Sequence, residues 1–76
     1  MKEFIKTMAR ALVDEPGEVS VNEICGAQTM IFELTVTKSD IGKVIGKKGK
    51  TAAALRTLLS AVSAKNKKKA VLEIMD

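Results

Sequence analysis

The segment that decides the fold is residues 41–59, IGKVIGKKGKTAAALRTLL. Two helical patterns in it flank a four-residue turn, Gly46-Lys47-Lys48-Gly49. Glycine at each end of the turn accepts backbone dihedrals that other residues avoid and lets another backbone approach closely. A turn that opens into a helix also offers N–H groups and the positive end of the helix dipole to an anion. With two lysines at its tip, the turn predicts a clamp for a phosphate backbone.

Helical periodicity extends on both sides of this turn. Before it, a short helix is expected from Asp40 to about Ile45, where Thr37 or Ser39 can cap free N–H groups and Asp40 favours the positive dipole end. After it, an alanine-rich helix is expected from Lys50 to Ala64. Its core-facing stripe is predicted to consist of Leu55, Leu58, Leu59 and Val62. The polar segment Asn66-Lys67-Lys68-Lys69 is expected to end the helix.

The other elements follow from apolar spacing. A helix is predicted from Lys2 to Val13, with Phe4 in the core, and strands are predicted from Val19 to Cys25, Met30 to Val36 and Ala70 to Met75. The order is α-β-β-α-α-β, without linkers or repeats. Helices packed on one face of a three-stranded sheet form a two-layer α+β fold. We expect residues 1–76 to form one domain, since 76 residues leave room for one small core.

Composition excludes several classes of function. The chain has no histidine, tryptophan or tyrosine, which removes the commonest general base and metal ligand. No enzyme activity and no cofactor or metal is therefore expected. No apolar run is long enough to span a bilayer, the N-terminus lacks a signal-peptide pattern, and a single cysteine, Cys25, fits a reducing compartment. These features predict a cytoplasmic protein with no membrane partner.

The charge distribution is uneven. The net charge is +4, but residues 38–69 contain ten basic residues and one acid, Asp40. The remaining residues contain three basic and eight acidic side chains. Such an asymmetry attracts a polyanion to one side of a domain.

Three nucleic-acid or nucleotide motifs compete with a backbone clamp. Gly49-Lys50-Thr51 resembles the end of a P-loop, but that motif needs glycine where this chain has Val44. A helix-turn-helix would use residues 50–64 as its recognition helix, in which only Arg56 can read a guanine edge bidentately. An RRM or cold-shock type reader needs surface aromatics, whereas Phe4 and Phe32 are expected in the core. A duplex DNA binder and a protein-assembly adaptor remain as alternatives.

The motif at residues 44–49, Val-Ile-Gly-Lys-Lys-Gly, preceded by Ile41-Gly42-Lys43, resembles the Ile-Gly-x-x-Gly core of the KH domain. That loop clamps four backbone nucleotides of a single strand. The order of elements resembles the bacterial type II form, which implies a mixed sheet, and the whole chain resembles the small single-KH proteins of the KhpA type. The resemblance implies an RNA chaperone or post-transcriptional regulator linked to cell shape and cell wall biogenesis. It also implies a homodimer, or a complex with a larger KH-containing protein.

The predicted RNA site is centred on the turn. Residues Gly46 to Gly49 would hold the sugar-phosphate backbone, with Lys47 and Lys48 as charge partners and the amides around Gly49 and Lys50 as donors. The floor under the bases would be formed by Ile41, Val44, Ile45 and Ala52, and the flanks by Lys43, Lys50 and Arg56. Gly42 would either belong to the groove or permit close helix packing. The family often has a bulky aliphatic residue where this chain has Ala52, which implies a shallower groove and weak base selectivity.

Overall fold

The computed structural model describes residues 2–65 and 67–75. Its helices are α1 (Lys2–Leu12), α2 (Ile41–Ile45) and α3 (Lys50–Lys65), and its strands are β1 (Ser20–Cys25), β2 (Thr29–Thr35) and β3 (Lys69–Met75). Three 3₁₀ turns join them, at Pro16–Glu18, Lys38–Asp40 and Lys47–Gly49. The predicted order is confirmed, and the described boundaries lie within about two residues of those expected. Asn66, predicted to help end the long helix, lies outside the described residues.

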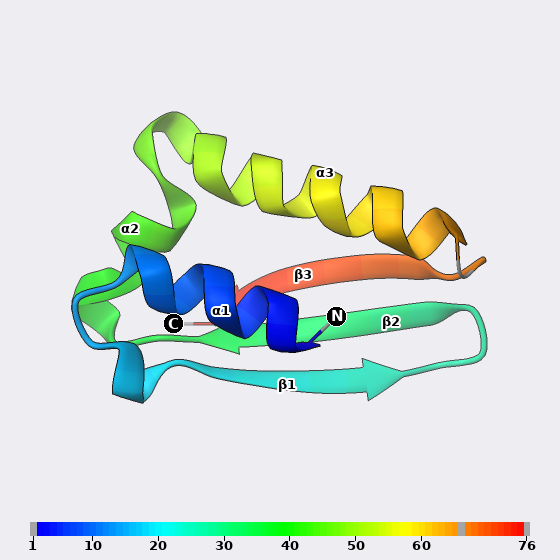
Figure 1. The fold of residues 1–76 in the computed structure, drawn as a ribbon, viewed down its shortest axis with the longest axis horizontal. Coiled ribbons are helices and arrows are strands. Elements are labelled where there is room, and N and C mark those ends of the chain that lie inside the picture. Colours follow the sequence, from blue (N-terminus) through cyan, green and yellow to red (C-terminus); the bar gives the residue numbers. More distant parts are fainter. Residues whose placement is uncertain (1, 66, 76) are drawn as a thin grey trace.

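The three strands form one mixed sheet in the order β1-β2-β3. β1 and β2 are antiparallel and are joined by a short turn, whereas β2 and β3 are parallel. A parallel pair needs a crossover connection, and here the crossover consists of α2, the glycine turn and α3. Helices α1 and α3 cover the same face of the sheet (Figure 1). The α+β architecture and the mixed sheet are therefore as predicted.

The core lies between the helices and the sheet. Val21, Phe32, Leu34 and Leu72 point from the strands toward the helices, and Ile5 and Ala9 of α1 pack against them. The remaining core members are Val19, Val36, Val44, Leu55 and Leu59. Because side chains alternate along a strand, the other half of each strand faces away from the helices.

The buried stripe of α3 differs from the predicted one. Ala52, Leu55, Leu59 and Ser63 are buried, whereas Leu58 and Val62 are 45% and 42% exposed. A helix on one side of a sheet buries only one stripe, and the apolar residues of α3 cover a wider arc than that stripe. The prediction that Leu58 and Val62 face the core was wrong. The hydroxyl of buried Ser63 donates to the Ser60 carbonyl oxygen at 3.1 Å, which satisfies its hydrogen bonding.

The prediction that Phe4 lies in the core was also wrong. The side chain of Phe4 is 40% exposed, whereas the smaller Ala9, also on α1, is fully buried in the core. An alanine at this contact lets α1 lie close to the sheet, and the bulky ring remains at the margin of the core. Phe32, the other aromatic residue, is fully buried as expected.

Candidate nucleic-acid interface

The turn between α2 and α3 has a backbone that requires both of its glycines. Gly46 and Gly49 have φ values of 78° and 74°. A Cβ atom at Gly46 would overlap the side chain of Thr51, whereas Gly49 has open space around it and needs glycine for its dihedral alone. Lys48 also has a positive φ, 57°, which is uncommon for a residue with a side chain. The turn is therefore a tightly specified structure.

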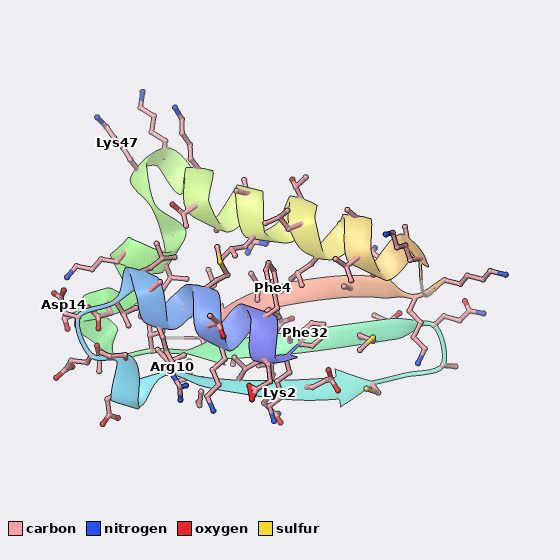
Figure 2. All side chains as sticks on the ribbon, viewed as in Figure 1. Lys2, Phe4, Arg10, Asp14, Phe32 and Lys47 are labelled. Atoms are coloured by element: carbon pink, nitrogen blue, oxygen red, sulfur yellow. The ribbon has the colours of Figure 1, made fainter. Side chains whose placement is uncertain are left out.

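Two lysines are exposed on this turn. Lys47 and Lys48 are exposed, and Lys47 extends away from the rest of the domain (Figure 2). The Gly49 N–H donates to the Gly46 carbonyl at 3.1 Å, and the Lys50 N–H donates to the Lys47 carbonyl. The amides expected to bind phosphate, those of Gly49 and Lys50, are thus used inside the turn. The amides of Lys47 and Lys48 begin it, where N–H groups have no earlier partner in the turn, and are better placed to meet an anion.

The four residues predicted to form the floor lie at different depths. Ile45 is exposed, and Ile41 is half-buried against the core. Val44 is fully buried in the core and Ala52 lies in the buried stripe of α3, so neither side chain forms the surface. Ala52 is 3% exposed, and the expectation that it leaves a shallower groove with weak base selectivity stays a prediction.

Gly42 lies on the exposed side of α2 beside the turn. A Cβ atom built there would have nothing within 4 Å. Close helix packing is therefore not the reason for glycine at this position. A place in the groove remains as the role predicted from the sequence for Gly42.

Lys43 does not face the turn. Its ammonium group forms an ion pair with Asp14, in the connection after α1, and lies 3.6 Å from an Asp40 carboxylate oxygen. The hydrogen bond from Lys43 to Asp14 raises the lysine pKa, and the charges of the two aspartates act in the same direction despite some desolvation. Lys43 thus anchors α2 to the α1–β1 connection.

Asp40 completes this anchor. Its side chain is 1% exposed and accepts hydrogen bonds from the N–H groups of Asp14 (3.3 Å) and Glu15 (3.1 Å) and from the Thr37 hydroxyl (2.9 Å). Burial opposes ionisation, but these bonds and the Lys43 charge outweigh it, so the pKa of Asp40 lies below its usual value. The predicted capping was wrong in detail: the Thr37 hydroxyl binds the Asp40 carboxylate, and that carboxylate binds the α1–β1 connection.

Lys50 and Arg56 lie along α3. Lys50 is exposed next to the turn. The Arg56 guanidinium reaches β3, where Nε and Nη2 each lie 3.5 Å from the Leu72 carbonyl oxygen. No acidic residue occurs in the sequence from Ile41 to Leu72. The turn, α3 and the start of β3 therefore form a basic segment.

Sequence reasoning missed three residues that shape this site. Asp14 and Asp40 hold α2 in place, and Thr51 packs where a Cβ atom at Gly46 would have to lie. The pattern Thr-x-x-Asp at residues 37–40 signals a local side-chain bond, but not its long-range partners, which lie 25 and 26 positions earlier. Contacts of this kind depend on the packed fold.

A tight glycine-lysine turn between two helices, carried on the crossover of a mixed sheet, is the arrangement of a KH domain. The family model described as "KhpA/KhpB, KH domain" matches residues 2–74. The chain belongs to this KhpA/KhpB family of KH domains.

Similar proteins carry a consistent name. "RNA-binding protein KhpA" of Caldanaerobacter subterraneus subsp. tengcongensis is 53% identical over 75 residues, which cover 99% of this chain and 100% of the relative. The protein of that name from Chlamydia caviae is 51% identical over 76 residues, covering 100% of this chain and 97% of the relative. The one from Clostridium perfringens is 48% identical over 75 residues, covering 99% and 100%. No solved structure matched the chain.

Proposed function

We propose that this chain is a non-enzymatic module that binds single-stranded RNA, with the turn from Gly46 to Gly49 gripping the sugar-phosphate backbone. The observation that carries the proposal is the turn itself, with exposed Lys47 and Lys48, two amides at its start and glycine dihedrals at both ends. The names of the relatives support RNA as the ligand. Ile45 and Gly42 offer surface to the bases, while Val44 and Ala52 support that surface from below.

A duplex DNA binder is less well supported. A recognition helix needs exposed polar side chains that reach base edges. The exposed positions of α3 are mostly alanine, serine and threonine, and Arg56 is directed at the Leu72 carbonyl of β3. Because the charge lies at the turn and at the far end of α3, backbone contact explains the surface better than base readout in a groove.

Binding of a fluorescent 12-mer, as single-stranded RNA and as duplex DNA over several salt concentrations, tests this proposal. We expect the single strand to bind more tightly. A four-nucleotide grip neutralises about three or four phosphates, so each turn should contribute about −2 to −3 to the slope of log K against log salt. Tighter binding to the duplex would contradict the proposal and favour the helix-turn-helix alternative.

Alanine at Gly42 tests whether the strand passes over α2. The added Cβ atom meets no neighbour, and alanine favours helix, so the stability should stay constant or rise by up to about 1 kcal/mol. We expect RNA affinity to fall about fivefold, because the methyl group lies where the strand would approach the backbone. Gly17→Ala is the control, since a Cβ atom at Gly17 also has open space. Equal RNA affinities of Gly42→Ala, Gly17→Ala and wild type would place the strand elsewhere.

The proposal includes a second copy of the chain or a larger KH-containing partner. One turn on about four nucleotides offers little contact, and association has a large entropic cost. Two turns on one RNA raise avidity by about 10²–10⁴ without new chemistry. The exposed Leu58 and Val62, among exposed alanines of α3, form a surface that supports helix-to-helix pairing.

On family resemblance, the proposal also includes chaperone or regulatory action, control of cell shape and cell wall, and a cytoplasmic site of action. Within residues 2–65 and 67–75, none of the helices has the length and apolar character to cross a bilayer.

Aspartate at Leu58 tests the pairing surface. We expect Leu58→Asp to shift a homodimer to monomer in sedimentation at about 50 µM and to weaken binding to a 12-mer about tenfold or more, because the second turn is lost. The fold should persist, since Leu58 is 45% exposed. Ile24→Asp on β1 is a matched control with the same exposure. A wild-type protein that is monomeric at this concentration would contradict self-pairing through α3.

A further inference from the structure

A second group of lysines lies at the opposite end of α3 from the glycine turn. Lys65 ends α3, Lys67 and Lys68 follow, and Lys69 begins β3. The backbone here is fixed: the N–H groups of Lys67, Lys68 and Lys69 donate to the carbonyls of Ala64 (3.3 Å), Ser63 (3.2 Å) and Gln28 (2.9 Å). Three successive lysines are therefore held on an ordered turn.

The side chains on this turn are available to a ligand. Lys67 and Lys69 are exposed and Lys68 is half-buried. The ion pairs found among the described residues involve Lys43 alone, with Asp14 and Asp40. Within that part of the chain, Lys67, Lys68 and Lys69 thus form no ion pair, so their charge is not neutralised by a neighbouring carboxylate.

The two lysine groups lie at the ends of one basic segment. α3 has 16 residues and so measures about 24 Å. The glycine turn is at one end of it and residues 67–69 are at the other, close to the turn between β1 and β2 (Figure 1). Arg56 lies between them, against the middle of β3. Since residues 41–72 contain no acid, nothing in this segment repels a polyanion along the way.

We propose that Lys67, Lys68 and Lys69 form a second phosphate-contact site for the same RNA strand that the glycine turn grips. This inference rests on the proposed function and extends it, because it sets the length of RNA that one domain engages. At the spacing of a stacked strand, about 3.4 Å per nucleotide, 24 Å corresponds to about seven nucleotides. A strand of about eight nucleotides or more reaches both sites, and a strand of four or five reaches only one.

The test compares a 5-mer and a 12-mer RNA of the same composition on Lys67→Gln/Lys68→Gln/Lys69→Gln and wild type. A matched control, Lys2→Gln/Lys6→Gln/Arg10→Gln, removes the same charge from α1. All proteins, the wild-type reference included, also carry Leu58→Gln, which disrupts the apolar pairing surface without adding a carboxylate between the two lysine groups, so that the longer RNA cannot gain affinity by joining two copies through α3. Affinities are measured by fluorescence anisotropy between about 50 and 300 mM salt.

We expect the lysine variant to bind the 12-mer about tenfold more weakly at 100 mM salt and the 5-mer within twofold of wild type. Its salt slope for the 12-mer should be less steep by about 2, the value for three lost phosphate contacts on a single strand. The α1 control should match wild type with both RNAs. Circular dichroism of each variant verifies that the fold is retained.

Three results would overturn the inference alone. The first is an equal loss of RNA affinity in the α1 control, which would indicate general attraction. The second is an equal loss of affinity for the 5-mer and the 12-mer in the lysine variant, which would indicate damage to the glycine turn. The third is a wild-type affinity that does not depend on RNA length. A wild-type domain that binds neither RNA would contradict the proposed function, and the inference with it.

Discussion

Lys47→Asp/Lys48→Asp is expected to abolish RNA binding, with a loss of about 100-fold or more. The double substitution changes the charge of the turn by four units at the point where the phosphates would pass. It also places aspartate carboxylates beside the two amides that an anion would use. Both side chains are exposed, so the thermal midpoint should move by only a few degrees. Fluorescence anisotropy with a single-stranded 12-mer measures the first effect and thermal unfolding the second.

The control has the same net charge as the turn variant. Lys2→Asp/Lys6→Asp on α1 changes the total by the same four units at a distance from the turn. If general attraction dominated, both variants would lose binding alike. RNA affinity within about twofold of wild type in the turn variant would reject the turn as the RNA site and favour a protein-assembly role.

Asp40→Ala is expected to lower the thermal midpoint by about 5–10 °C. The substitution leaves the N–H groups of Asp14 and Glu15 and the Thr37 hydroxyl without the acceptor that they now share. Because α2 then loses its link to the α1–β1 connection, RNA affinity should fall as well. Asp14→Asn is the control, since exposed Asp14 contributes its side chain to the Lys43 ion pair alone. Equal midpoints for Asp40→Ala and Asp14→Asn would contradict this role of Asp40.

The loss of stability at low pH gives an independent measure of how much the Asp40 carboxylate stabilises the fold. The pKa of Asp40 is lower in the folded protein than in the unfolded chain, where it is about 3.9. As the pH falls, Asp40 is therefore protonated in the unfolded chain before it is protonated in the folded protein. The stabilisation by the Asp40 carboxylate is complete above about pH 4 and is lost as the pH falls through the pKa of Asp40 in the folded protein. Urea unfolding between pH 5 and pH 2 should show a shallower decline for Asp40→Asn than for wild type. Parallel declines would assign the acid sensitivity to other groups.

Most of the fold follows from local patterns. The alternation of Phe32, Leu34 and Val36 identifies a strand, Pro16-Gly17 ends the first helix, and the glycine turn separates two helices. The mixed sheet came from the family resemblance, because strand direction depends on the crossover and is not encoded in any single strand. Local patterns were sufficient wherever one periodicity determined the element.

The predictions that were wrong concern residues whose burial depends on the surface that their helix packs against. Leu58 and Val62 have the spacing of a core stripe, but α3 has more apolar positions than the sheet beneath it can cover. Phe4 is displaced to the margin because Ala9 makes the close contact. Within the candidate site, the turn was evident from its glycines, whereas the Asp40 anchor depends on two backbone amides far away in sequence.

The parallel pairing of β2 with β3 has a kinetic consequence. Thr29 pairs with Lys69 and Thr35 with Met75, so partners in this ladder are 40 positions apart, whereas Cys25 and Met30 at the β1–β2 turn are 5 apart. Because closing a long loop costs entropy and distant contacts slow folding, we expect the formation of this ladder to be the slow step of folding. The chain closed by that step is α2, the glycine turn and α3. Completion of the sheet and assembly of the glycine turn are therefore expected to be one event on the folding pathway.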